Sequence, residues 1–157
     1  MILYHGSNQE IKEIDLTKTR PNKDFGQGFY LTADKQQAMQ IAAQKVIQSD
    51  GTPTINVYEF DESYLSGNEL NVKIFEGYTE EWARFILANR NRESRTKIHD
   101  YDIVIGAIAD DKVGLQLFRY MKKYIDLPTL VKNLQFVKLT TQYYFGTERA
   151  IKLLKKL

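Results

Sequence analysis

The sequence predicts a mixed α+β fold in a single domain. Its 157 residues are enough for one compact domain with a hydrophobic core. Short β-branched and aromatic segments, which are typical of strands, are interspersed with helical stretches. The two kinds do not alternate regularly, which argues against a doubly wound parallel sheet. No repeat or Pro-rich linker divides the chain, so we expect one domain over residues 1–157.

The first half of the chain predicts three strands and a helix. Residues 2–5 and residues 28–32 are short, mainly apolar segments that predict strands. Asp34 can accept hydrogen bonds from the next turn, so it caps a helix whose apolar residues recur at helical spacing as far as Val46. The β-branched and aromatic segment 54–60 predicts a third strand.

The second half predicts further helices around a buried strand. Thr79 can cap a helix with an apolar stripe, and the continuously apolar residues 103–109 predict a strand buried on both faces. We expect a helix from Asp110-Asp111 that bears Leu117, Met121 and Tyr124, and a shorter helix after Pro128. One or two strands should follow in residues 135–145. A last helix, capped by Thr147, should carry the apolar series Ala150, Leu153, Leu154 and Leu157.

Composition excludes several kinds of chemistry. The chain has no Cys and only two His residues, so disulfides, thiol nucleophiles and a three-His metal site are excluded, and we expect no metal. A net charge of +2 is too small to indicate nucleic-acid binding by itself. No apolar run is long enough to cross a membrane, and the amino terminus lacks the features of a signal peptide. We therefore expect a cytoplasmic protein without membrane partners.

Three segments contain residues that suit a binding site. His5-Gly6 ends a predicted strand, where an imidazole can bond a hydroxyl and a bare glycine lets a ligand approach the backbone. Gly26-Gln27-Gly28 precedes a strand that carries Tyr30, but it does not match a Rossmann or Walker loop. Gln142 opens an otherwise aromatic strand and should point to the same face as Tyr144. Each segment alone also fits a structural role: a turn, a core tyrosine or an exposed polar residue.

Together, these segments resemble the ADP-ribosyltransferase superfamily, in its poly(ADP-ribose) polymerase and diphtheria-toxin-like branch. The chain is similar almost end to end to a bacterial family, domain of unknown function 3990. The segments that carry this resemblance are Leu3-Tyr4-His5-Gly6-Ser7, Asp24 to Thr32, Tyr101 to Gly106 with Ala109-Asp110-Asp111, and Gln142 to Thr147. The resemblance implies two small mixed or antiparallel sheets that form a split core with flanking helices and an NAD cleft between them.

The resemblance also implies roles for individual residues. His5 matches the triad His that bonds a ribose hydroxyl of NAD, and Gly6 would pair its backbone with the nicotinamide carboxamide. Tyr30 matches the triad Tyr that stacks on the nicotinamide ring, and Gln142 falls at the third catalytic position. The NAD-binding set implied in this way comprises His5, Gly6, Ser7, Gly28 and Tyr30. NAD would serve as a substrate.

Two departures from the family pattern limit the chemistry. Polymerases have a second stacking Tyr in the helix that follows, and this chain has none between Ala38 and Ile41. Gln142 stands where polymerases usually have Glu, and an amide cannot act as a general base at neutral pH. Transfer of a single ADP-ribose is therefore expected in place of polymerisation. Asp24, Asp110 and Asp111 could supply a distant carboxylate, although a turn or helix cap also explains each of them.

The expected function is therefore that of an NAD-dependent mono-ADP-ribosyltransferase, a pentosyl transferase that modifies a macromolecule. The resemblance suggests a bacterial toxin with an antitoxin protein as its partner. NAD glycohydrolase activity and an inactive NAD- or ADP-ribose-binding module are the alternatives. The acceptor is a protein or a nucleic acid, and the basic segment from Arg84 to Lys97 is a candidate surface for it, although a solvated loop would look the same.

Overall fold

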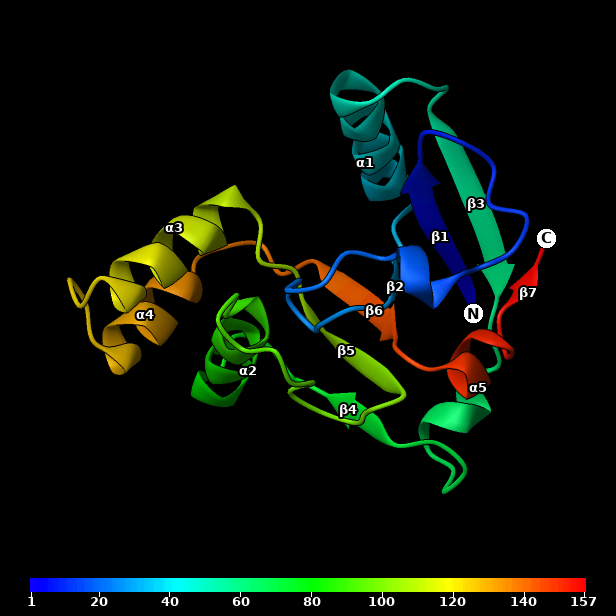
Figure 1. Cartoon of the computed structure of the whole chain (residues 1–157). Helices are drawn as coiled ribbons and strands as arrows, with labels where there is room; N and C mark the ends of the chain where they lie inside the picture. The colour runs from blue at the N-terminus through cyan, green and yellow to red at the C-terminus, as the bar shows by residue number, and fades with distance from the viewer.

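Two small β-sheets form the centre of the molecule (Figure 1). The computed structural model describes residues 1–157. The first sheet is antiparallel and contains, in spatial order, β1 (Ile2–Ser7), β3 (Thr54–Glu59) and β7 (Lys155–Lys156). The second sheet contains β2 (Phe29–Leu31), β6 (Thr141–Phe145), β5 (Ile103–Ala107) and β4 (Val72–Ile74). Only the pair β4–β5 is parallel, so the second sheet is mixed.

Five α-helices flank the sheets. They are α1 (Lys35–Gln48), α2 (Glu80–Arg90), α3 (Asp111–Met121), α4 (Leu127–Leu134) and α5 (Glu148–Ile151). Short 3₁₀ turns lie at Leu16–Lys18 and Glu62–Leu65. In Figure 1, α1 lies beside β1 and β3, whereas α2, α3 and α4 gather on the side of the second sheet. The predicted α+β class with two small sheets and five helices is thus confirmed.

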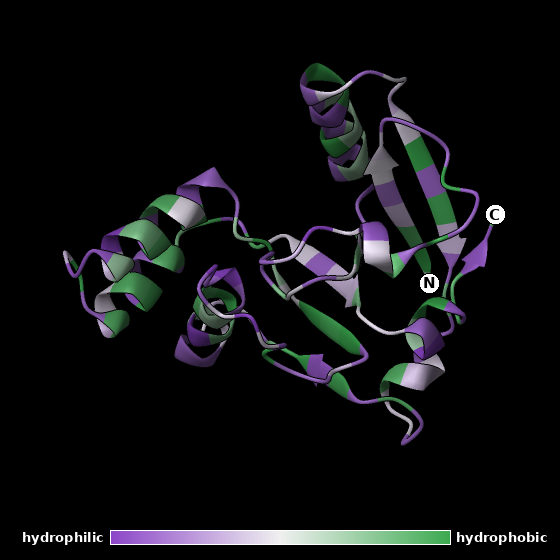
Figure 2. Ribbon diagram, viewed as in Figure 1, coloured by the Kyte–Doolittle hydropathy of each residue, from purple (hydrophilic) through white to green (hydrophobic).

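The core is divided in two by the second sheet. One cluster packs Val104 and Tyr144 from that sheet against Phe25 and the apolar faces of α2, α3 and α4. The other fills the space between the sheets, where Leu3 and Tyr58 of the first meet residues of β2, β5 and β6. Strand β5 is buried along its whole length, as the sequence predicts, and Figure 2 shows it mainly hydrophobic.

The two sheets are joined by one β-bridge between β1 and the residue after β2. The Tyr4 N–H donates to the Thr32 carbonyl at 2.8 Å, and the Thr32 N–H donates to the Tyr4 carbonyl at 2.9 Å. This bridge fixes the end of β1 beside the end of β2, which are the segments that carry His5 and Tyr30.

The predicted helix caps are confirmed. The Asp34 side chain accepts hydrogen bonds from the two backbone N–H groups at the start of α1. Thr79 caps α2 and Asp110 caps α3 in the same way. Asp110 is therefore a capping residue, and Glu148 lies in the first turn of α5, where its charge suits the helix dipole.

Three details of the sequence-based prediction are wrong. The last helix ends at Ile151, because the chain then turns and pairs residues 155–156 with β3. On α3, Leu117 is buried, but Met121 is 63% exposed and Tyr124, beyond the helix, is 73% exposed. The short strand β4 was not predicted, since three residues are too few to show an alternating pattern. No helix has both the length and the apolar character needed to cross a membrane.

Candidate functional site

The structure brings His5 and Tyr30 together at the bridge between the sheets. The His5 Nδ1 atom lies 2.7 Å from the Tyr30 carbonyl oxygen, so Nδ1 carries the proton and donates it. The imidazole also stacks on Phe29, with 4.4 Å between the ring centroids. The orientation of His5 is therefore set by strand β2 and does not depend on a ligand.

A lysine from α1 completes this arrangement. Lys45 Nζ donates to the Gly6 carbonyl oxygen at 2.7 Å and lies 3.3 Å from His5 Nε2, which accepts because Nδ1 holds the proton. Burial, reinforced by the charge of Lys45, lowers the pKa of His5 to about 3. His5 is thus a neutral hydrogen-bonding group throughout the physiological pH range.

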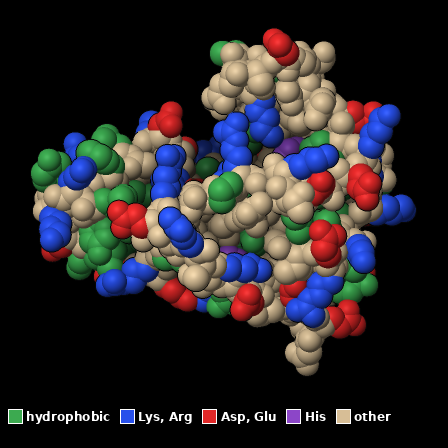
Figure 3. All heavy atoms as spheres, in the orientation of Figure 1, with side chains coloured by type: hydrophobic (Ala, Val, Ile, Leu, Met, Phe, Trp, Pro, Cys, Tyr) green, Lys and Arg blue, Asp and Glu red, His purple; other side chains and the backbone are tan.

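Lys23 and Lys45 lie next to Tyr30 and His5, and the charge of Arg20 acts on both lysines; we call Arg20, Lys23 and Lys45 the cationic cluster. Lys23 Nζ lies 4.6 Å from the centroid of the Tyr30 ring. Burial lowers the pKa of Lys23, and burial together with the charges of Lys23 and Arg20 lowers the pKa of Lys45 to about 8. None of the three forms an ion pair within the protein. Figure 3 shows Lys and Arg side chains around a hollowed part of the surface below α1, where a His is visible.

The hydroxyl of Tyr30 holds the glycine-containing loop that precedes β2. It donates to the Gly26 carbonyl oxygen at 2.7 Å and accepts from the Phe25 N–H at 3.0 Å. Burial raises the pKa of Tyr30 far above its ordinary value of 10, so the hydroxyl stays protonated. The ring of Tyr30 can therefore contact a ligand only through its face, because its hydroxyl is fully engaged by the loop.

Gln142 lies in a polar network on the same face of the second sheet as Tyr30 and Tyr144, as the strand alternation predicts. It is 9% exposed, and its Nε2 donates to Asp24 Oδ2 at 3.3 Å. Asp24 Oδ1 accepts in turn from Arg90 Nε at 2.7 Å. The Oε1 atom of Gln142 has no partner in the protein. The Gln142 side chain forms no hydrogen bond with His5 or Tyr30, and the Asp24–Phe25 segment links it to Tyr30.

The other predicted binding residues, Gly6, Gly28 and Ser7, have structural roles. A Cβ atom on Gly6 would lie 2.1 Å from a backbone oxygen of α1, and one on Gly28 would lie 2.2 Å from a ring atom of Tyr144. Both positions therefore require glycine for packing. The buried Ser7 hydroxyl donates to Asn8 Oδ1 at 3.5 Å. No group of three or more His, Cys, Asp or Glu residues is arranged to hold a metal ion.

Sequence reasoning missed the cationic cluster and the ion pair of Asp24. One signal for Lys45 was present, because it follows Ala38 and Ala42 at positions i+7 and i+3 on the buried stripe of α1. A lysine on an apolar stripe indicates a special role. Arg90 belongs to the basic segment that was expected to be a solvated loop or an acceptor surface, but its guanidinium is committed to Asp24.

Comparison with known proteins places the chain in a family. No curated protein and no solved structure matches it. A family model described as "Protein of unknown function (DUF3990)" matches residues 1–156, which is nearly the whole chain. The resemblance to that family is thereby confirmed, and the protein belongs to the DUF3990 family.

Proposed function

We propose that the protein has an ADP-ribosyltransferase-like fold and transfers a single ADP-ribose from NAD to a macromolecule. The observation that carries the proposal is the unpaired cationic cluster beside a neutral His5 and the ring of Tyr30. A dinucleotide supplies a matching ligand, since it combines a diphosphate, ribose hydroxyls and a planar nicotinamide ring. Lys45 is half-buried without a carboxylate partner, which is costly in the free protein, so an anionic ligand would stabilise its charge.

Lys45 provides a way for NAD to enter. Its ammonium group donates to the neutral carbonyl of Gly6 and covers His5 Nε2. A diphosphate is a stronger acceptor, so its arrival draws Lys45 away from both groups. The Gly6 carbonyl oxygen and His5 Nε2 then become free, the first to accept from the nicotinamide carboxamide and the second from a ribose hydroxyl.

The reaction breaks the bond between nicotinamide and ribose. Nicotinamide leaves with the bonding electron pair, positive charge develops on the ribose, and the acceptor forms a new bond to C1′ and loses a proton. Gln142 Oε1 can accept from a ribose hydroxyl and hold the sugar, but an amide does not remove a proton at neutral pH. The charge of Asp24 is shared with Arg90. The site therefore suits an acceptor that is already nucleophilic and does not suit polymerisation.

The alternatives are NAD hydrolysis and NAD or ADP-ribose binding without turnover. The observation that favours a binding module is the polar network itself: the third catalytic position holds an amide, and the nearest carboxylate, Asp24, is neutralised by Arg90. Hydrolysis would need only water as the acceptor in the same site.

Labelled NAD incubated with the protein and cell extract separates these functions. Label on a macromolecule indicates transfer, free nicotinamide without such label indicates hydrolysis, and binding without turnover indicates the module. His5→Ala and Tyr30→Ala should abolish the signal, and Lys45→Gln should weaken NAD binding. Lys35→Gln, which changes an exposed charge on the same helix, is the matched control. Loss of activity in the control alone would contradict the assigned site.

The proposed toxin role has its own test. Induced expression in the bacterial cytoplasm should stop growth, and His5→Ala should remove the effect if the toxicity depends on NAD. A protein antitoxin would restore growth with the unmodified chain. Toxicity that survives His5→Ala would separate growth arrest from the proposed chemistry.

A further inference from the structure

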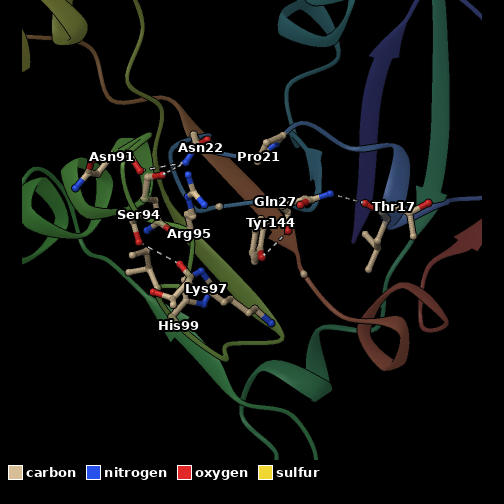
Figure 4. Close-up of a pocket in the computed structure, with 16 residues that line it drawn as sticks. Thr17, Pro21, Asn22, Gln27, Asn91, Ser94, Arg95, Lys97, His99 and Tyr144 are labelled. Atoms are coloured by element: carbon tan, nitrogen blue, oxygen red, sulfur yellow. Dashed lines mark hydrogen bonds between the residues drawn. The ribbon is translucent and has the colours of Figure 1, made fainter.

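A cavity lies beside the loop that carries Arg20 and Lys23. It has a volume of about 670 Å³ and is formed by residues 16–27 and 89–99, with Tyr144 and Gly146 completing its lining (Figure 4). Asn22 and Gln27 line it, whereas Lys23 turns away to the ring of Tyr30. His5, Tyr30 and Gln142 do not line it, so it is separate from the candidate NAD site. Its volume falls in the range of small-molecule sites.

The side chain of a buried residue, Asn89, presents an unpaired acceptor to this cavity. Asn89 is only 4% exposed, and its Nδ2 donates to the Phe85 carbonyl oxygen at 2.7 Å. Its Oδ1 has no hydrogen-bond partner in the protein. That atom stays accessible because Gly26, which has φ +95°, carries no side chain; a Cβ there would lie 3.1 Å from it. Because this oxygen is unpaired and accessible from the cavity, the N–H of a ligand can donate to it.

The charge around the cavity is positive. Arg95 and Lys97 line it and no carboxylate does. Figure 4 shows the Arg95 side chain pointing toward Asn22 on the opposite loop. Arg95 has no ion pair, and the exposed Lys97 has only a 3.9 Å contact with Asp100. These two cations are free to bind phosphate.

We infer that this cavity binds one nucleotide of a single-stranded nucleic acid. The exocyclic amino group of a base donates to Asn89 Oδ1, and flanking phosphates lie against Arg95 and Lys97. The ring of His99 and the edge of Tyr144 form an apolar wall for the base. The inference of nucleotide binding depends only on the cavity. The further step, that this strand is the acceptor of ADP-ribose, rests on the proposed function.

Fluorescence anisotropy with labelled single-stranded dA, dC and dT 12-mers tests the site. We expect dA and dC, whose bases carry an exocyclic amino group, to bind several-fold more tightly than dT. The double variant Arg95→Gln/Lys97→Gln should weaken binding and reduce the slope of log K against log salt by about 1.4, which is about 0.7 for each phosphate that the protein no longer neutralises. The matched control Arg84→Gln/Arg92→Gln removes the same charge outside the cavity and should change binding much less.

Several results would overturn the inference: no binding at low salt, equal affinity for the three strands, or an equal effect of the two double variants. Competition by AMP distinguishes a free nucleotide from a nucleic-acid strand. If AMP binds as tightly as the 12-mer, the ligand of the cavity is a free nucleotide and the inference of strand binding fails. NAD titration separates the two sites. Arg95→Gln/Lys97→Gln should retain NAD binding, and if NAD binding disappears instead, the cavity holds NAD itself and the inference fails.

Discussion

Replacing Lys45 with Met should leave the fold as stable as the unmodified protein, or more stable, while weakening NAD binding. Burial, together with the charges of Lys23 and Arg20, lowers the pKa of Lys45 from 10.5 to about 8. At about 1.4 kcal/mol per pKa unit, the charged form costs the folded state up to about 3 kcal/mol. Lys45 is only partly buried, and solvent screening reduces this cost to about 1–2 kcal/mol.

The variant also lacks a favourable hydrogen bond. The 2.7 Å bond from Lys45 to the Gly6 carbonyl oxygen disappears, and such a bond contributes about 1 kcal/mol. The net expectation at pH 7 is therefore a rise of about 0–1 kcal/mol in the free energy of unfolding. A residue whose removal stabilises the fold and weakens binding is one retained for its ligand.

The dependence on pH fixes the sign of the effect. The folded protein releases the Lys45 proton near pH 8, whereas the unfolded chain keeps it up to about pH 10.5. The unmodified protein therefore gains stability between these pH values. The advantage of Lys45→Met is largest below pH 8 and shrinks as the pH rises toward 10.

Urea unfolding followed by the fluorescence of Trp82, the single tryptophan and fully buried, measures this difference at pH 7 and pH 9.5. Lys35→Met is the control, because Lys35 is exposed at the start of α1. A loss of more than about 2 kcal/mol in Lys45→Met, beyond the value of one hydrogen bond, would refute the reasoning. So would a difference from the unmodified protein that is the same at both pH values.

Three further changes test the structure. Tyr30→Phe keeps the ring but leaves the Phe25 N–H unpaired, so urea unfolding should show a loss of about 1–3 kcal/mol, and limited proteolysis should cut residues 22–28 faster. Asp102→Asn should cost about 2–4 kcal/mol, because Asp102 is buried and ion-paired with Arg149. Burial raises the pKa of Asp102, but its hydrogen bonds outweigh burial and lower it, so the stability that Asp102 supplies is lost as the pH falls below the ordinary carboxyl value of about 4. A stability difference between Asp102→Asn and the unmodified protein that does not shrink below that pH would contradict this. Gly6→Ala places a methyl group 2.1 Å from a carbonyl oxygen of α1 and should lower the melting temperature by several degrees in calorimetry; an unchanged value would show that α1 shifts freely.

Local features of the fold could be predicted from the sequence because their causes are local. Asp34, Thr79 and Asp110 cap helices through side chains that reach only two or three residues along the chain. The apolar run 103–109 marked β5 because a strand covered on both faces needs no alternation. The prediction of a longer carboxy-terminal helix failed for the opposite reason. Its leucine spacing suits a helix, but pairing with β3 overrides that preference, and the pairing partner is almost a hundred residues away.

The candidate site also has parts that could be predicted from the sequence and parts that could not. The family resemblance pointed to His5, Tyr30 and Gln142, and the structure places the first two in contact. The groups that determine their chemistry come from distant segments: Lys45 reaches His5 from α1, and Gln142 meets Asp24 across more than a hundred residues. A single sequence carries no information on such contacts, because side-chain polarity alone does not say which charges face each other.

The interleaving of the two sheets also sets the order in which the protein can be made. β3 lies between strands from opposite ends of the chain, and β2 pairs with β6, which emerges from the ribosome more than a hundred residues later. The first sheet cannot close on the nascent chain until β7 has emerged, and the second cannot close until β6 has emerged, so both sheets form over long loops. Strands β1 and β3 can pair early. The loop that contains Asp24 and Gln27 cannot form its hydrogen bonds to Gln142 and Tyr144 until β6 is present. The candidate site should therefore be complete only once β6 has left the ribosome, and truncated chains that end before β6 should lack the proposed activity.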